Sequence, residues 1–155
     1  MNIFKFIVSI TLCFVVAFLG SAFTLPSITT WYAQLNKPFF SPPNWIFGPV
    51  WTVLYFLMGV SLYIIWNKNL KNKKKEDAIK IFIFQLILNL LWSLVFFGLH
   101  QPLLAFIAII ILWISIFMMI KYFYKISKTS AYLLVPYIIW VTFASILNLA
   151  VAVLN

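Results

Sequence analysis

Residues 31–51 read WYAQLNKPFFSPPNWIFGPVW and join two long apolar runs. This link holds prolines at positions 38, 42, 43 and 49 and tryptophans at positions 31, 45 and 51. Each proline fixes its own φ angle and favours extended geometry in the residue before it, so we expect a link of fixed shape that is neither helix nor strand. Its indole rings suit a large planar ligand at a membrane boundary, although an interfacial aromatic belt with proline turns explains the same residues more simply.

The composition is that of an integral membrane protein. Hydrophobic residues make up 65% of the 155 residues, charged residues make up 8%, and the mean hydropathy is +1.09. Five apolar runs approach or exceed the roughly 20 residues that cross a hydrocarbon core as helix, and none shows the strict alternation of a barrel strand. We therefore predict an all-α, single-domain bundle of five transmembrane helices over residues 1–155. The expected spans are 3–25, 45–66, 79–99, 102–122 and 130–153, with an outward-facing loop at 26–44.

The first apolar run also has features of a signal peptide. Lys5 precedes it, and Gly20-Ser21-Ala22 resembles a small-residue cleavage site. The run is longer than the apolar region of most signal peptides, and the small residues Ala17 and Ser21, four apart, equally suit close helix packing. We therefore favour a first span. The single cysteine, Cys13, lies inside it and is expected to pack as a small apolar residue.

The distribution of lysine predicts the topology. All eleven basic residues are lysines, and in a five-span arrangement ten of them fall on one side while Lys37 alone falls on the other. By the positive-inside bias, the N-terminus is expected in the cytoplasm and the C-terminus outside, in a plasma membrane. Because these lysines lie in short loops beside spans, their net charge of +9 favours contact with anionic lipid headgroups over binding of nucleic acid.

Several classes of chemistry lack the residues they need. Glu76 and Asp77 are the only carboxylates and lie in a basic segment expected to form a loop, while the apolar cores of the spans hold no acidic, basic or histidine residue. Ion pumps, proton-coupled transporters and metal sites depend on such residues, so we expect no metal site. No hydrolytic triad or pair of catalytic carboxylates can be assembled. The lone His100 is expected to be a solvated turn residue.

Uncharged polar and aromatic residues recur at helical spacing in two of the spans. In the third span they are Gln85, Asn89, Trp92, Ser93 and Phe96, and in the fifth they are Tyr137, Trp140, Ala144, Leu147 and Asn148. Together with Trp51 of the second span, they predict one aromatic cavity in the outer half of the bundle, with one or two amide or indole donors for a planar hydrophobic ligand. Hydrogen bonding between helices is the alternative explanation, and we favour it for Gln85 and Asn148.

Five blocks carry a resemblance to a known family. They are WYAQLNKP (31–38), PPNW (42–45), GPVWTVLYFLMG (48–59), NLLWSLVFFG (89–98) and PYIIWVTFASILN (136–148). In this order they resemble the TspO/MBR family, the tryptophan-rich sensory proteins that include the mitochondrial translocator protein, or peripheral benzodiazepine receptor. The resemblance covers nearly the whole chain.

The resemblance implies a five-helix membrane receptor that binds protoporphyrin IX and related planar hydrophobic molecules, and it suggests a role in their transport or regulation. It requires no cofactor, with porphyrin as the ligand, and it implies frequent dimers, which leaves open a homodimer of this chain. Trp51 and Asn89 correspond to polar ligand contacts, and Trp140, Ala144 and Leu147 to the wall from the last helix. The full set of candidate ligand-binding residues is Trp51, Asn89, Trp140, Ala144, Leu147, Ser21, Trp31, Pro42, Pro43, Phe47, Tyr55, Trp92, Phe96 and Asn148.

Two other functions remain open. Bacterial relatives suggest a light-dependent porphyrin-degrading enzyme that uses Trp51 and Trp140, and both residues are present. A small permease is a third alternative. The uncharged spans and the lack of an internal repeat count against it.

The chain also departs from the family pattern. Leu149 stands where the family's cholesterol-recognition pattern has a tyrosine and no basic residue follows, which counts against sterol binding through that element. Leu90 replaces a common aromatic residue and is expected to reshape the pocket.

The lysine asymmetry makes a topological prediction. A reporter fused after Asn155 is expected to be active outside the cytoplasm, and one inserted in Lys71–Lys75 is expected to be active inside it. Paired phosphatase and fluorescent-protein fusions measure this directly. The opposite pattern of activity would reverse the expected orientation of the bundle and of its cavity.

Overall fold

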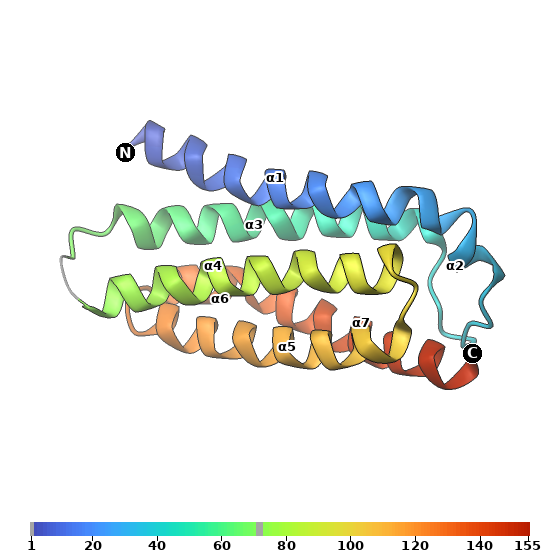
Figure 1. The fold of residues 1–155 in the computed structure, drawn as a ribbon. Coiled ribbons are helices and arrows are strands. Elements are labelled where there is room, and N and C mark those ends of the chain that lie inside the picture. The colour runs from blue at the N-terminus through green and yellow to red at the C-terminus, as the bar shows by residue number, and fades with distance from the viewer. Residues whose placement is uncertain (1, 71–72) are drawn as a thin grey trace.

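The structure is a computed structural model that describes residues 2–70 and 73–155. Long helices lie side by side along one axis, and a short helix, α2, lies beyond them at one end (Figure 1). The elements, in chain order, are α1 (Ile3–Ile28), α2 (Trp31–Gln34), the 3₁₀ turn η1 (Asn44–Ile46), α3 (Phe47–Asn67), α4 (Lys73–Ser93), the π-helical turn η2 (Leu94–Gly98), α5 (Pro102–Tyr124), α6 (Lys128–Leu133) and α7 (Val135–Leu154).

The five-helix architecture predicted from the sequence is confirmed. Within the described residues, five helical segments are long and apolar enough to cross a membrane. They run over Ile3–Ile28, Asn44–Asn67, Lys73–Gly98, Pro102–Tyr124 and Lys128–Leu154. The protein is therefore an all-α integral membrane protein.

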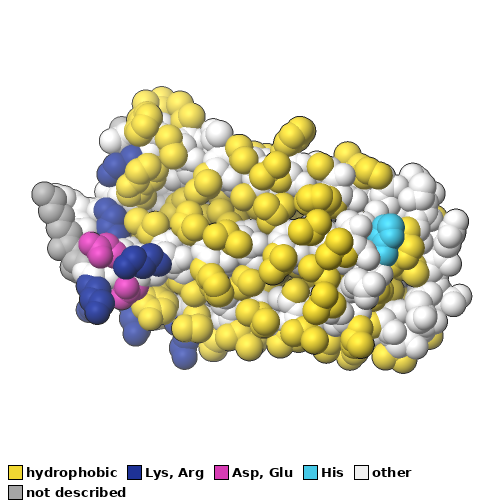
Figure 2. Space-filling view, viewed as in Figure 1, with side chains coloured by type: hydrophobic (Ala, Val, Ile, Leu, Met, Phe, Trp, Pro, Cys, Tyr) yellow, Lys and Arg dark blue, Asp and Glu magenta, His cyan; other side chains and the backbone are white. Residues whose placement is uncertain are grey.

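The two ends of the bundle differ in charge. Every described lysine except Lys37 lies at the end where α1 begins, and we call this the lysine-rich end. Figure 2 shows the dark blue lysines gathered there, while His100 marks the opposite end, which we call the loop end because it carries residues 29–46. Apolar side chains cover the surface between the two ends, as expected for a surface in contact with lipid.

Close packing at the lysine-rich half joins α1 to α3. A Cβ atom added to Gly59 of α3 would lie 2.7 Å from Cδ1 of Ile10 and 3.0 Å from its Cα, so only glycine permits this approach. Cys13 is fully buried nearby, as expected of a packing residue. A second close contact joins α3 to α6, where Ser61 and Ser130 each donate a hydrogen bond to the other's carbonyl oxygen, at 2.9 and 2.7 Å.

The proline-rich link is more helical than predicted. The expectation that residues 31–51 are neither helix nor strand is correct for residues 35–43 and wrong for the rest, because Trp31–Gln34 forms α2, Asn44–Ile46 forms η1, and α3 begins at Phe47. Pro49 is compatible with α3 because it lies in the first turn, where a backbone N–H has no intrahelical acceptor. The acidic residues Glu76 and Asp77 likewise lie in α4 rather than in a loop.

Hydrogen bonds hold the link against the bundle at two places. The Asn36 N–H donates to Oδ1 of Asn155 at 2.9 Å, and Nδ2 of Asn155 donates to the Asn36 carbonyl at 3.0 Å. On the other side, the Trp31 ring stacks on the His100 ring, with centroids 4.4 Å apart. The expected turn position of His100 is therefore correct, but its ring packs on the link, and its backbone has a positive φ of 56°.

Candidate functional site

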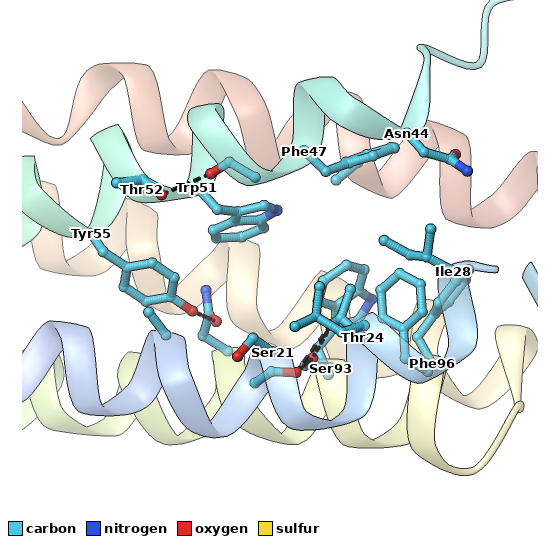
Figure 3. Close-up of a pocket in the computed structure, with 18 of the residues that line it drawn as sticks. Ser21, Thr24, Ile28, Asn44, Phe47, Trp51, Thr52, Tyr55, Ser93 and Phe96 are labelled. Atoms are coloured by element: carbon cyan, nitrogen blue, oxygen red, sulfur yellow. Dashed lines mark hydrogen bonds between the residues drawn. The ribbon is translucent and has the colours of Figure 1, made fainter.

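A cavity of about 660 Å³ opens in the half of the bundle near the loop end. Its walls come from α1, the link, α3, α4 with η2, and α7, and Figure 3 shows many of these side chains projecting into it. The volume lies within the range of sites for drug-sized ligands. Among its deepest residues are Phe14, Tyr55, Asn89 and Trp140, each the lining residue of its helix closest to the lysine-rich end.

Aromatic rings form two of the walls. On one side Trp51 stacks with Trp92 at 6.3 Å between ring centroids, and Trp92 stacks with Phe96 at 5.7 Å. On the other side Phe47 of α3 meets the Trp140 ring of α7 edge-on at 6.0 Å. Such surfaces favour a flat, unsaturated ligand, because ring stacking adds to the gain from burial.

The π-helical turn η2 contributes two adjacent residues to the cavity. Phe96 and Phe97 both line it, and the N–H of Leu99 donates to the carbonyl of Leu94, five residues earlier, at 2.8 Å. A π turn holds more residues per turn than an α-helix, which brings neighbouring side chains closer to one face. Turns of this kind are frequent at functional sites.

A buried hydrogen-bond network closes the deep end of the cavity. The Tyr55 hydroxyl donates to Oδ1 of Asn89 at 2.6 Å, and Nδ2 of Asn89 donates to the Tyr137 hydroxyl at 2.8 Å. Tyr137 in turn donates to Oε1 of Gln85 at 2.9 Å. The network therefore ties α3, α4 and α7 together, and the amide of Asn89 is already paired on both its oxygen and its nitrogen.

Hydroxyl groups from α1 and α4 line a third wall. Thr24 and Ser93 both donate to the Gly20 carbonyl, at 3.1 and 3.2 Å, and their own oxygens lie 3.2 Å apart (Figure 3). Ser21 donates to the Phe18 carbonyl at 2.7 Å. Because these hydrogens point to the backbone, the hydroxyls offer acceptor lone pairs to the cavity rather than donors.

Several donors of the lining have no hydrogen-bond partner among the described residues, and they include the indole N–H groups of Trp51 and Trp140 and the buried hydroxyl of Tyr32. Nε1 of Trp140 is buried and has no hydrogen-bond partner in the described part of the chain, although an unsatisfied buried donor is costly. No hydrogen bond is found there for Nε1 of Trp51 either, whereas Nε1 of Trp92 donates to Asn148 at 3.0 Å. A ligand that presents acceptors to Trp140 and Trp51 would satisfy both donors.

Charged groups are absent from the lining, as far as the described residues go. The nearest cation at the loop end is Lys37, whose ammonium lies 4.7 Å from the ring centroid of the lining residue Tyr32. Burial raises the pKa of the Tyr32 hydroxyl above its ordinary value. Within residues 2–70 and 73–155, no cluster of His, Cys or carboxylate residues could hold a metal ion.

The cavity is open on the side between α1 and α3. Phe18 of α1 and Trp45 of η1 both line it, yet each is 74% exposed. Both lie in segments that can cross a membrane, so the opening faces the lipid rather than water alone.

Comparison with known proteins places the chain in a family. The sequence model of the TspO/MBR family matches residues 9–154. The tryptophan-rich protein TspO of Archaeoglobus fulgidus is 50% identical over 155 residues, covering 100% of this chain and 99% of that protein. The translocator protein of Homo sapiens is 35% identical over 136 residues, covering 86% and 80%. The chain belongs to the TspO/MBR family.

A third relative extends the comparison to bacteria. The tryptophan-rich sensory protein of Cereibacter sphaeroides is 34% identical over 125 residues, covering 81% of this chain and 77% of that protein. Membership of the TspO/MBR family confirms the resemblance seen in the five sequence blocks, and it agrees with the membrane-spanning bundle.

Most candidate residues taken from the TspO/MBR resemblance lie around this one cavity. Those that line it are Ser21, Phe47, Trp51, Tyr55, Asn89, Trp92, Phe96, Trp140, Ala144, Leu147 and Asn148. The exceptions are Trp31, Pro42 and Pro43, which do not line it. Trp31 packs against His100 and Phe96 instead, and the two prolines shape the link outside the cavity.

Sequence reasoning missed most of the wall that α1 contributes. Phe14, Phe18, Thr24, Leu25 and Ile28 line the cavity, and the interpretation of Ala17 and Ser21 as a helix-packing pair is incomplete because both also face it. This helix carries almost no polar stripe, so periodicity alone could not show which face is turned inward. The small residues Ala17, Gly20 and Ser21 were the available signal.

The hydrogen-bond network at the deep end of the cavity changes the roles expected of two residues, ligand binding for Asn89 and helix packing for Gln85. Gln85 is fully buried, does not line the cavity and acts in packing, as predicted, but Asn89 both lines the cavity and belongs to the same network. Replacing either residue by Leu leaves the hydrogen of a buried tyrosine hydroxyl without an acceptor. We expect each variant to lose about 1–3 kcal/mol of unfolding free energy, measured by thermal denaturation in detergent.

Ligand binding should separate the two variants. Asn89→Leu is expected to weaken protoporphyrin binding, followed by tryptophan fluorescence quenching, while Gln85→Leu leaves the dissociation constant unchanged. Equal losses of affinity would mean that the network acts as one unit on the cavity. An unchanged melting temperature in Asn89→Leu would show that its two hydrogen bonds do not support the fold.

Proposed function

We propose that this TspO/MBR family member is a membrane receptor that binds a tetrapyrrole or another planar hydrophobic molecule in the cavity. The observation that carries the proposal is the aromatic cavity itself, whose lining has no charged group among the described residues and includes Trp51 and Trp140, two tryptophans with unpaired indole N–H groups. A pyrrole-derived macrocycle with carbonyl or carboxylate substituents supplies both the flat face and the acceptors that this arrangement favours.

The chemistry of the cavity supports binding or sensing more than proton transfer. The hydroxyls of Thr24, Tyr55 and Ser93 donate within the protein, and no acid or base of ordinary catalytic type lines the cavity among the described residues. The lateral opening at Phe18 and Trp45 supports uptake of the ligand from the lipid phase. A role in moving or regulating tetrapyrroles follows from such reversible binding.

The proposal includes an orientation. The lysine-rich end lies in the cytoplasm and the loop end outside, in a plasma membrane, because nine described lysines gather at one end and only Lys37 lies at the other. The archaeal and bacterial relatives, whose cells offer the plasma membrane as the main site for helical membrane proteins, support this location.

Trp140→Phe tests the function through its unpaired donor. Removing an N–H that has no partner in the protein should change the free energy of unfolding little. The bound ligand, in contrast, loses a hydrogen bond that is made away from water. We expect affinity for protoporphyrin to fall by roughly five- to thirtyfold, about 1–2 kcal/mol, with the melting temperature maintained. Fluorescence quenching titrations and thermal denaturation measure the two quantities.

Trp92→Phe is the matched control. Its N–H is paired with Asn148, which also donates to the Pro102 carbonyl at 2.7 Å, so this variant should lose stability. If the binding curves of Trp140→Phe and the parent protein coincide, the Trp140 N–H does not contact the ligand. The proposed mode of binding would then be wrong.

A second candidate function is light-dependent degradation of a bound porphyrin. The observation in its favour is that Trp51 and Trp140 line the same cavity, and that Trp51 lies within 6.3 Å, between ring centroids, of Trp92, Tyr55 and Tyr137. These rings are oxidisable neighbours of any ligand in the cavity.

Illumination of the protein with protoporphyrin in air distinguishes the two functions. For a receptor, we expect only unspecific bleaching of the ligand, equal in the parent protein and in Trp51→Phe. A defined product whose yield falls in Trp51→Phe, at ligand concentrations that saturate both proteins, would establish the enzyme instead. Product analysis by liquid chromatography with mass spectrometry provides the measurement.

A further inference from the structure

A second hollow lies at the lysine-rich end, far from the ligand cavity. Its volume is about 720 Å³, and its lining comes from the end of α3, the segment that follows it, and the first turns of α4. The lining residues are Trp66, Leu70, Lys73, Lys75, Glu76, Ile79 and Lys80. None of them takes part in the proposed binding of a tetrapyrrole.

Two ammonium groups converge at this hollow. Nζ of Lys5, from the first turn of α1, donates to the Trp66 carbonyl at 3.3 Å, and Nζ of Lys75 donates to the same oxygen at 2.8 Å. Lys75 also donates to the Lys68 carbonyl at 2.8 Å. Both lysines are half-buried, so the fold brings together two like charges that would otherwise separate in water.

The carbonyl groups at the end of α3 offset only part of the positive charge that the two lysines bring. The C-terminus of a helix such as α3 carries the equivalent of about half a negative charge, which cannot balance two ammonium ions. The wider surroundings add more positive charge, because Lys68, Lys73, Lys74 and Lys80 outnumber Glu76 and Asp77. The region therefore keeps an excess of positive charge that an anion would relieve.

The rest of the hollow is apolar. Trp66, Leu70 and Ile79 line it beside the charged residues, and the Lys5 ammonium lies 5.8 Å from the Trp66 ring centroid. A small inorganic anion would use only the lysines. An amphiphile would use both surfaces, with its anionic group on the lysines and its first methylene groups against the apolar residues.

The level of the hollow in the membrane indicates which class of amphiphile it suits. The apolar span of α3 ends at Asn67 and that of α4 follows the lysines at its start, so the hollow lies where the hydrocarbon region gives way to water. Phospholipid headgroups occupy this level, and basic pockets between helices are suited to anionic ones. We propose that the hollow lined by Trp66 and Lys75, beside which Lys5 bonds the Trp66 carbonyl, binds the headgroup of an anionic phospholipid.

Native mass spectrometry of the full chain tests this site. The protein in neutral detergent is titrated separately with phosphatidylglycerol, phosphatidylcholine and inorganic phosphate. We expect one phosphatidylglycerol to bind more tightly than phosphatidylcholine, and the double variant Lys5→Gln/Lys75→Gln to weaken that binding about thirtyfold. Phosphatidylcholine binding should not change.

The matched control is Lys125→Gln/Lys128→Gln. It removes the same charge at the same end of the bundle, where these lysines lie over Tyr122 and Tyr124 rather than at the hollow. An equal loss of phosphatidylglycerol in this control would overturn the site in favour of general surface charge. Phosphate binding that matches phosphatidylglycerol and depends on Lys5 and Lys75 would assign the hollow to a soluble anion instead.

The single variant Lys5→Gln covers the case in which the double variant does not fold. Lys5 bonds only a carbonyl that Lys75 also bonds, so its loss leaves α3 capped. We expect about a fivefold loss of phosphatidylglycerol affinity. Unchanged affinity in this folded variant would exclude Lys5, and with it the proposed convergence of charges.

Discussion

The paired amide of Asn89 is the interaction on which the cavity depends. Asn89 accepts from Tyr55 of α3 and donates to Tyr137 of α7, so one side chain of α4 fixes the positions of two other helices. In a bundle without charged residues in its interior, neutral hydrogen bonds are the directional contacts that remain, and in lipid they cannot be exchanged for water. Toward the lysine-rich end the helices pack closely, as at Gly59, and toward the loop end they diverge around open space.

Polar groups in the cavity fall into two kinds, and the difference separates fold from function. The hydroxyls of Thr24 and Ser93 and the indole of Trp92 are paired within the protein and hold helices together. Nε1 of Trp140 is buried and unpaired, which costs stability that the rest of the fold must offset. Such an unpaired donor is expected where a bound ligand supplies the missing acceptor.

The sequence predicted the spans and most of the site because both leave periodic signals. Long apolar runs indicate helices, and the stripe through Asn89, Trp92 and Phe96 indicates a cavity-facing surface. What escaped prediction depends on contacts between distant residues. The Asn36–Asn155 bonds span most of the chain, the α1 wall has no polar stripe, and the helix at Trp31–Gln34 forms although prolines follow it. The role of Asn89 was half right because composition cannot show whether an amide is already paired.

Helix α1 lines the ligand cavity and, through the Lys5 bond to Trp66, also reaches a residue that lines the hollow at the lysine-rich end. At the lysine-rich end it is held to α3 by the approach at Gly59 and by the Lys5 bond to Trp66, and at the loop end Ser27 donates to the Phe97 carbonyl. Between these attachments its residues form the cavity wall that faces α3, and the opening lies there, at Phe18 and Trp45. Any widening of the opening must therefore bend α1 between fixed ends or release one of them. A headgroup bound at Lys5 would strengthen the attachment at the lysine-rich end.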